Sequence, residues 1–558
     1  MSFNHIIGSN SSSKPDLSPK DSTDMKNMYS RKEAKEVKER KLNQLIYPSL
    51  TIYETSFLSV AWIFILIYSW YLVYTVSRKY YLSFVNQGFM IETWFSQFLS
   101  YQSDFTDHEW NVSSWNLMYS IPWIFFHFFG SQILRKTNKN IVPIFNVLLS
   151  MIYLERIIGI KQTIWILCQP LFMFVIHLME SSLLTWIVAL TFLFVEKEIS
   201  GPLYYMNTHF LQGCTDNEKD LIHGLWHWVN LRCVSFCLDR IWKDVEASSK
   251  GRISDLVEML AYCFYLPVSF SGPIIIYKDF HEGFNKEYQP WTIQRLKNFL
   301  LQILRYSFWL LIGHVVLHFF YPSSIQYDMK ILTSLGLWTL AGVGLSIGGF
   351  FQLKYVIFYG WPRPFVMEDG INKAPPHPKC IYRITRYSEM WRYFDNGLYL
   401  FLQKYIYQPI VEYYGDGWKK MIGATFTFTY IYLWHQMSVH IMLWSIFNYL
   451  SVMTEMLAIS LGKNPIYANL EKQWLSPKGQ RRFHAALVAP LFVGSVLANF
   501  YFFMESEVGH YFVYRAFTSW PIETPLIFIF AYIGVQFSIE VKNRELRHEI
   551  YHEWKQYE

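Results

Sequence analysis

The chain has 558 residues, of which 52% are hydrophobic and only 16% are charged, and its formal net charge is +6. Soluble domains usually carry about 25% charged residues, so this composition is that of a membrane protein. Its basic residues are spread over the termini and loops without a basic and aromatic groove pattern, which argues against a nucleic-acid partner. Six cysteines without a CxxC pair exclude a disulfide framework.

The chain starts with polar sequence. Residues 1–27 are rich in Ser, Asp and Lys, which predicts disorder, and residues 28–45 pair Glu with Lys at helical spacing, which predicts a charged helix. Six Lys or Arg residues within 31–41 precede the first apolar run, so we expect a cytosolic N-terminus. We therefore expect a cytosolic extension over 1–49, one membrane domain over 50–545 and a cytosolic tail over 546–558.

Apolar runs of about 20 residues then recur along the chain, as transmembrane helices require. They predict an all-α polytopic membrane protein with about ten full spans and one or two partial ones around a central tunnel. Two stretches, 141–157 and 395–412, are too short or too polar to cross, which favours re-entrant or interfacial segments. The predicted runs lie near 53–75, 115–134, 141–157, 163–178, 181–197, 222–242, 255–276, 296–320, 330–358, 421–450, 483–504 and 522–541.

Two ionisable residues stand out because charge at membrane depth is costly and usually functional. His435 lies inside the apolar run 421–450, and Asp395 lies forty residues upstream in an aromatic segment. Imidazole can accept a proton near pH 7, so the pair suggests proton-transfer chemistry within the bilayer. The alternatives are a structural histidine that hydrogen-bonds a neighbouring helix and a surface ion pair between Asp395 and Arg392.

Other candidates are less specific. His223 and His227 are spaced for a metal, but no HExxH glutamate accompanies them, so a structural role is favoured. Cys233 and Cys237 are better explained as packed thiols. Residues 265–273 contain two prolines and a glycine, which predicts a kinked or broken helix. Cys380 follows a proline-rich loop and could ligate metal, although a lone cysteine is usually inert.

Four motifs together carry a resemblance. The sequences Pro378-Lys-Cys380, Trp391-Arg-Tyr-Phe-Asp395-Asn-Gly-Leu, Tyr405-Ile-Tyr-Gln-Pro409 and Trp434-His435 resemble the membrane-bound O-acyltransferase superfamily. Within it, they are most similar to the branch that palmitoylates the N-terminal cysteine of hedgehog-like secreted signalling proteins. The similarity covers roughly residues 50–545. It departs at Gln436, where a glycine usually follows the histidine.

The resemblance implies a set of roles. His435 and Asp395 match the catalytic pair, with His435 as general base and Asp395 orienting the acceptor amine. Cys380 matches a cysteine that ligates a structural haem iron. We expect Trp391, Arg392 and Trp434 to contact substrate, and palmitoyl-CoA to be the acyl donor.

The implied partners are long-chain acyl-CoA, membrane lipid and a secreted protein with an N-terminal cysteine, and the implied location is the endoplasmic reticulum membrane or the Golgi. Two other functions stay open at this point. One is a lipid or glycerol O-acyltransferase of the same superfamily, and the other is a proton-coupled transporter that uses the same two residues.

Overall fold

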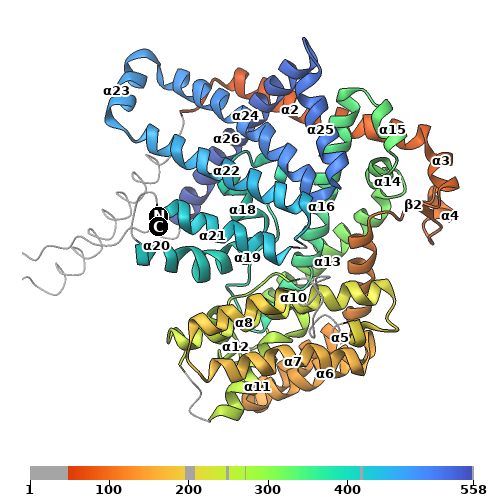
Figure 1. Ribbon diagram of the computed structural model, residues 1–558, viewed down its shortest axis with the longest axis vertical. Helices are drawn as coiled ribbons and strands as arrows, with labels where there is room; N and C mark the ends of the chain where they lie inside the picture. The colour runs from red at the N-terminus through yellow and green to blue at the C-terminus, as the bar shows by residue number, and fades with distance from the viewer. Residues whose placement is uncertain are drawn as a thin grey trace, which may run out of the picture.

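The computed structural model describes residues 48–194, 208–246, 251–270, 272–414, 419–435 and 437–555 (Figure 1). The disorder and charged helix expected within residues 1–45 lie outside the described residues. The first half of the described chain contains α2 (Ile52–Lys79), α3 (Tyr81–Asn86), α4 (Ser96–Leu99), α5 (His108–Thr137), α6 (Val142–Ile158), α7 (Ile160–His177), α8 (Ser182–Phe194), α10 (Asp216–Ile241), α11 (Arg252–Cys263) and α12 (Tyr277–Phe284).

The second half contains α13 (Ile293–Val316), α14 (Pro322–Tyr327), α15 (Met329–Ser334), α16 (Leu337–Gly360), α17 (Arg363–Glu368), α18 (Tyr387–Phe394), α19 (Asn396–Leu402), α20 (Gln408–Tyr414), α21 (Lys419–Trp434), α22 (Val439–Gly462), α23 (Pro465–Trp474), α24 (Pro477–Phe503), α25 (Ser506–Thr518) and α26 (Glu523–Lys555). Short 3₁₀ turns occupy Lys139–Ile141, Leu266–Val268 and Ile381–Arg383, and a π-helical turn, Gln403–Tyr407, joins α19 to α20. The strands β1 (Met90–Ile91) and β2 (Ser103–Asp104) form a two-residue antiparallel ladder.

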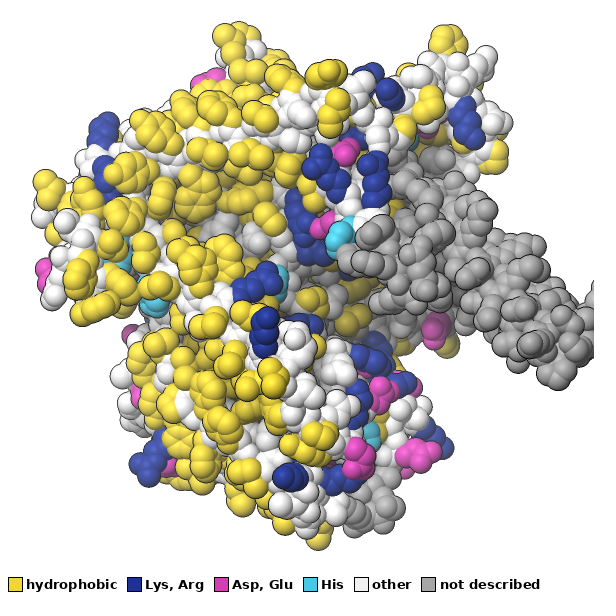
Figure 2. Space-filling model, turned by 180° about the vertical axis from the view of Figure 1, so that it is seen from behind, with side chains coloured by type: hydrophobic (Ala, Val, Ile, Leu, Met, Phe, Trp, Pro, Cys, Tyr) yellow, Lys and Arg dark blue, Asp and Glu magenta, His cyan; other side chains and the backbone are white. Residues whose placement is uncertain are grey.

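In the described part of the chain, nine helices are long and apolar enough to cross a membrane. They confirm the all-α polytopic class. Exposed apolar side chains cover much of the surface, as lipid contact requires. Figure 2 shows Lys and Arg side chains among them near the middle of this face. The candidate spans are Ile52–Lys79, His108–Thr137, Lys139–Ile158, Ile160–His177, Ile293–Val316, Leu337–Glu368, Val439–Gly462, Pro477–Phe503 and Glu523–His548.

Several predicted spans were wrong. The stretch 141–157 was expected not to cross, but the 3₁₀ turn before α6 lengthens the helix to 20 residues. The predicted spans 222–242 and 255–276 are not among the candidates, because α10 carries charged residues along its length and α11 has only 12 residues. The run 421–450 divides into α21 and α22, so hydrophobicity alone missed the break at His435.

The apolar interior has two parts. One lies among α5–α13 and α19–α22, and the other lies among α2, α14, α15 and α24–α26. Helix α16 contributes to both, with Leu340 in the second part and Phe350 in the first. Figure 1 shows α18, α19 and α21 between the lower helices and the upper ones. The segments that carry His435 and Asp395 therefore lie where the two parts meet.

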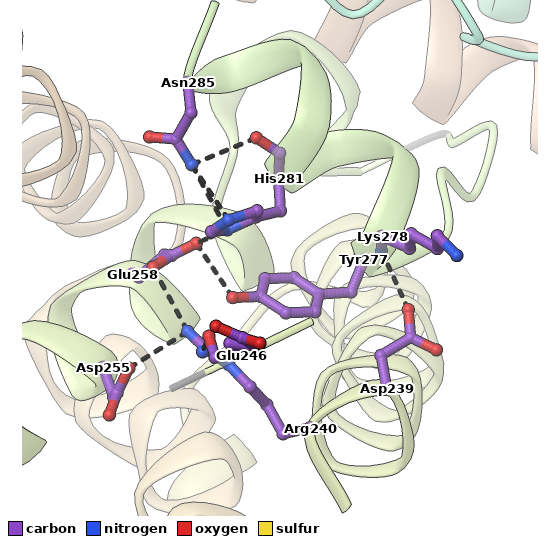
Figure 3. A network of polar contacts seen from close by, with 9 residues as sticks. All are labelled: Asp239, Arg240, Glu246, Asp255, Glu258, Tyr277, Lys278, His281 and Asn285. Atoms are coloured by element: carbon purple, nitrogen blue, oxygen red, sulfur yellow. Dashed lines mark hydrogen bonds and ion pairs between the residues drawn. The ribbon is translucent and has the colours of Figure 1, made fainter. Parts of the chain in front are cut away.

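Polar side chains fix the lower part internally (Figure 3). The guanidinium of Arg240 on α10 pairs with Asp255 at 3.0 Å and with Glu258 at 3.3 Å, both on α11. Glu258 also accepts the hydroxyl of Tyr277 at 2.8 Å and contacts the ring of His281, both on α12. We call these five residues the clamp, because their mutual contacts tie three helices together.

The break predicted within residues 265–273 is confirmed. Helix α11 ends at Cys263, and only one 3₁₀ turn follows. The buried guanidinium of Arg232 donates to the carbonyl oxygens of Cys263 at 2.9 Å and Ser269 at 3.2 Å. A helix end freed from its own hydrogen bonds is thus satisfied by a side chain, which makes the break a stable feature.

Candidate active site

His435 occupies the turn that separates α21 from α22. Its backbone N–H still bonds to the carbonyl of Ile431 at 2.9 Å, as in a continuing helix. Two residues later, Met437 adopts φ 52°, in the left-handed region, and α22 begins at Val439. The chain reverses there, so the imidazole is presented at the end of a helix. Gln436, the departure from the superfamily motif, lies outside the described residues.

Three aromatic rings surround the imidazole edge to face. Their centroids lie 4.8 Å (Trp434), 5.5 Å (Trp444) and 5.2 Å (Phe502) from that of His435. Trp444 comes from α22 and Phe502 from the end of α24. We call these three residues the aromatic enclosure. It shields one side of His435 from water and gives the imidazole apolar surroundings.

Asp395 caps the N-terminus of α19. Its Oδ1 accepts the N–H of Leu398 at 2.9 Å, and its Oδ2 accepts the hydroxyl of Tyr359 at 2.8 Å. The ion pair with Arg392 considered from sequence is absent from the described residues, because Arg392 is exposed and its guanidinium lies 5.7 Å above the ring of Tyr399. The carboxylate is half-buried and held by two donors.

Aromatic contacts connect the Asp395 segment to His435. Phe394 stacks on Phe351 at 5.3 Å, and Phe351 contacts Phe502 of the aromatic enclosure at 5.6 Å. Trp391 also contacts Trp444, at 5.4 Å. The two segments therefore converge, as the sequence suggested, but the described residues contain no hydrogen bond between Asp395 and His435.

A series of contacts that connects Asp395 to buried charged residues was not predicted from the sequence. Tyr359 packs edge-on against Tyr355 at 5.1 Å, and the Tyr355 hydroxyl donates to Glu109 at 2.7 Å. The neighbouring ammonium of Lys354 contacts Glu109 at 2.6 Å and Asp107 at 3.0 Å. Lys354, a lysine well inside the apolar run 330–358, was the available signal, since such charges in a span need partners.

Of the His223 and His227 pair, assigned a structural role from sequence, His227 borders the site. The ring of Trp434 lies between two imidazoles, with centroids 4.8 Å from His435 and 6.0 Å from His227. No group of three or more metal-ligating side chains occurs in the described residues. Cys233 lies in the core with its sulfur 3.7 Å from that of Cys263, and Cys237 is buried nearby, as expected of packed thiols.

Cys380 does not support the haem expected there. The thiol is exposed and lies just before the 3₁₀ turn Ile381–Arg383. The nearby cavity measures about 60 Å³ and is lined in part by Lys379, Arg383, Tyr393 and Lys542, but not by Cys380 itself. A drug-sized ligand needs roughly 300 Å³ or more, so the residues present do not enclose a macrocycle.

These features define a polytopic helical membrane protein with an ionisable pair at the meeting point of its two apolar parts. A model of the membrane-bound O-acyltransferase family matches residues 50–498, and the chain belongs to this family. It is accordingly an acyltransferase.

Individual relatives give more detail. The chain is 31% identical to Protein-cysteine N-palmitoyltransferase Rasp of Drosophila melanogaster, over 54% of this chain and 59% of that protein. It is 27% identical to Protein-cysteine N-palmitoyltransferase HHAT of Mus musculus, over 83% of this chain and 93% of that protein. Membrane-bound O-acyltransferase GUP1 of Millerozyma farinosa is 23% identical over 38% of this chain and 41% of that protein.

Proposed function

We propose that this protein transfers a palmitoyl group from palmitoyl-CoA to the N-terminal amine of a cysteine in a secreted signalling protein of the hedgehog type. The placement of His435 inside the aromatic enclosure carries the proposal, together with the names of the Drosophila and mouse relatives. We place the reaction in the endoplasmic reticulum membrane or the Golgi, where a cytosolic donor can meet a lumenal acceptor.

His435 would act as the general base. An α-amino group has a pKa near 8, so at neutral pH most of it is protonated and cannot attack. His435 removes a proton from it, directly or through a water, and the freed nitrogen attacks the thioester carbonyl. The carbon–sulfur bond then breaks, the nitrogen gives up its second proton to water, and the imidazolium of His435 protonates the departing thiolate. CoA leaves as a thiol, and an amide remains on the cysteine. The aromatic enclosure keeps bulk water away, which suppresses hydrolysis of the thioester.

Asp395 would attract and orient the acceptor ammonium. Two donors fix its carboxylate, so its charge has a defined position when the substrate arrives. Because no hydrogen bond joins it to His435 in the described residues, we assign it to the substrate and to stabilising the charge on the imidazolium at a distance. Such fixed charges stabilise a transition state strongly in a desolvated site.

The remaining predicted contacts divide between the acyl chain and the CoA group of the donor. Trp391 and Trp434 offer apolar faces beside His435 for the start of the acyl chain. The exposed guanidinium of Arg392 is available to the CoA phosphates, and guanidinium is well suited to phosphate.

The test is acyl transfer by detergent-purified protein from palmitoyl-CoA to a synthetic peptide with an N-terminal cysteine. An N-acetylated peptide is the substrate control. His435→Ala should lose about 10² to 10⁴ in rate. His440→Ala is the matched control: its imidazole lies five residues further along, at hydrogen-bonding distance from Ser438, and its loss should leave transfer near the wild-type rate.

Transfer to the N-acetylated peptide at the same rate would contradict the proposal. Labelling of lipid, with no transfer to either peptide, would instead favour a lipid or glycerol O-acyltransferase, the activity class suggested by the more distant GUP1 similarity.

A further inference from the structure

Helix α23 exposes an apolar stripe at the far end of the hairpin formed by α22 and α24. Ile466, Leu470 and Trp474 are spaced four residues apart and are 72%, 51% and 79% exposed. Side chains at this spacing share one helix face. Figure 1 shows α23 running crosswise to α22 and α24 at the edge of the molecule. A short amphipathic helix in that position has the geometry of an interfacial segment.

The charges around the stripe are unbalanced. Lys463, Lys472 and Lys478 are exposed, and none of them forms an ion pair with another described residue. The one acidic residue of α23, Glu471, pairs with His484 at 2.7 Å. Three exposed lysines therefore lie on α23 or next to its ends without an ion-pair partner among the described residues.

The helix lies on the same side of the membrane as the start of α2. Just beyond α23, Arg481 donates to the carbonyl of Pro48 at 3.0 Å, and Arg482 pairs with Glu54 at 2.8 Å. The basic residues within 31–41 precede α2, which favours the cytosolic side for this end. The cytosolic leaflet carries the anionic lipids.

We propose that α23 is an anionic-lipid-binding helix that lies in the cytosolic membrane interface. The apolar stripe inserts between lipids and the three lysines contact anionic headgroups. The adjoining ends of α22 and α24 also expose apolar side chains, so exposed apolar surface continues along the chain on both sides of α23; these side chains are Leu457 and Leu461 of α22 and Phe483 and Leu487 of α24. That continuity favours lipid over a protein partner as the occupant.

Lipid binding at α23 should also affect the candidate active site. The opposite end of the same hairpin carries Trp444 and Phe502, two of the three rings of the aromatic enclosure. Anchoring α23 thus restrains the hairpin that positions His435. Anionic lipid should therefore raise acyl transfer as well as protect α23.

The experiment is amide hydrogen exchange of the full chain in nanodiscs of phosphatidylcholine, with and without added phosphatidylserine. Amide exchange of residues 465–474 should be at least about fivefold slower with the anionic lipid. Each lysine near an anionic surface raises the membrane affinity by about that factor. The variant Lys463→Gln/Lys472→Gln/Lys478→Gln should lose this difference. The matched control, Lys286→Gln/Lys297→Gln/Lys330→Gln, removes three exposed lysines elsewhere and should keep it.

Equal exchange of residues 465–474 in both discs would overturn the proposal, as would a difference that the triple variant retains. Protection that appears only at high protein concentration, with a dimer in chemical cross-linking, would assign the face to a second copy and reject lipid. Hydrogen exchange does not depend on the acyl acceptor, so this result and that of the transfer assay can fail separately.

Discussion

The clamp and the aromatic enclosure both hold a histidine among packed helices, but they surround it with opposite chemistry. In the clamp, His281 meets the carboxylate of Glu258, which also receives Tyr277 and Arg240. In the enclosure, three rings pack around His435, and the polar residue assigned to work with it lies beyond them. The first arrangement pairs opposite charges, and the second surrounds an imidazole with aromatic rings.

We expect the chemistry of the surrounding side chains to distinguish structural from reactive ionisable groups better than the degree of burial does. A buried polar group with a full set of partners stabilises a fold, and replacing it leaves its partners buried without a counter-charge. On the proposed function, the imidazole enclosed by aromatic rings is held ready for a substrate. Changes at the clamp should therefore reduce stability, whereas changes around His435 and Asp395 should reduce rate.

Asp395→Asn should produce the largest effect on rate. Asparagine can still cap α19, so the N–H of Leu398 keeps its acceptor and the melting temperature should stay near that of the wild type. The negative charge is lost, and acyl transfer should fall by about 10² to 10⁴, as for other groups that act in proton transfer. Transfer kinetics and thermal unfolding of one preparation separate the two effects. A stable variant with wild-type kinetics would remove Asp395 from the chemistry.

Arg240→Ala should produce the largest effect on stability. It leaves Asp255 and Glu258 without their cation, and breaking a buried pair costs about 3 to 5 kcal/mol. The measurement is the apparent melting temperature in detergent. The variant Arg240→Met/Asp255→Asn/Glu258→Gln removes all three charges and should recover much of the loss. No recovery would mean that packing around Arg240, rather than charge, holds the three helices.

Tyr359→Phe should have an intermediate effect on rate. It removes the hydroxyl that donates to Oδ2 of Asp395 and keeps the ring against Tyr355. A hydrogen bond to a charged group contributes about 1.5 to 3 kcal/mol, so kcat should fall roughly ten- to a hundredfold if that bond positions the carboxylate. Tyr355→Phe, which removes the bond to Glu109 one turn away, is the comparison. Equal losses in both would point to general damage of α16.

The sequence predicted the fold class and the convergence of the two segments, because apolar length and misplaced charge are local signals. It did not predict the break after His435, since the run 421–450 is long and mostly apolar and the interruption depends on backbone geometry at Met437. Nor did it predict that Tyr359 holds Asp395, a contact between residues 36 apart on different helices. Partners of that kind depend on tertiary packing, which periodicity does not encode. The catalytic roles of His435 and Asp395 came from charge at membrane depth and from motif resemblance, and they stay predictions.

The pH dependence of stability should be the smallest effect and should belong to the clamp. Burial alone would raise the pKa of Glu258, but the bonds from His281 and Tyr277 and the charge of Arg240 outweigh it, so the pKa lies below 4.5. The unfolded chain then binds more protons than the folded one near that pH. This contribution to stability is therefore present above about pH 4.5 and is lost as the pH falls through the folded pKa. Melting curves from pH 7 to 4 should decline less steeply for Glu258→Gln than for the wild type, from a lower starting temperature. Glu287→Gln, which removes an exposed carboxylate paired with Lys139, should keep the wild-type slope, and a flattened slope in that control would assign the acid sensitivity to surface charge.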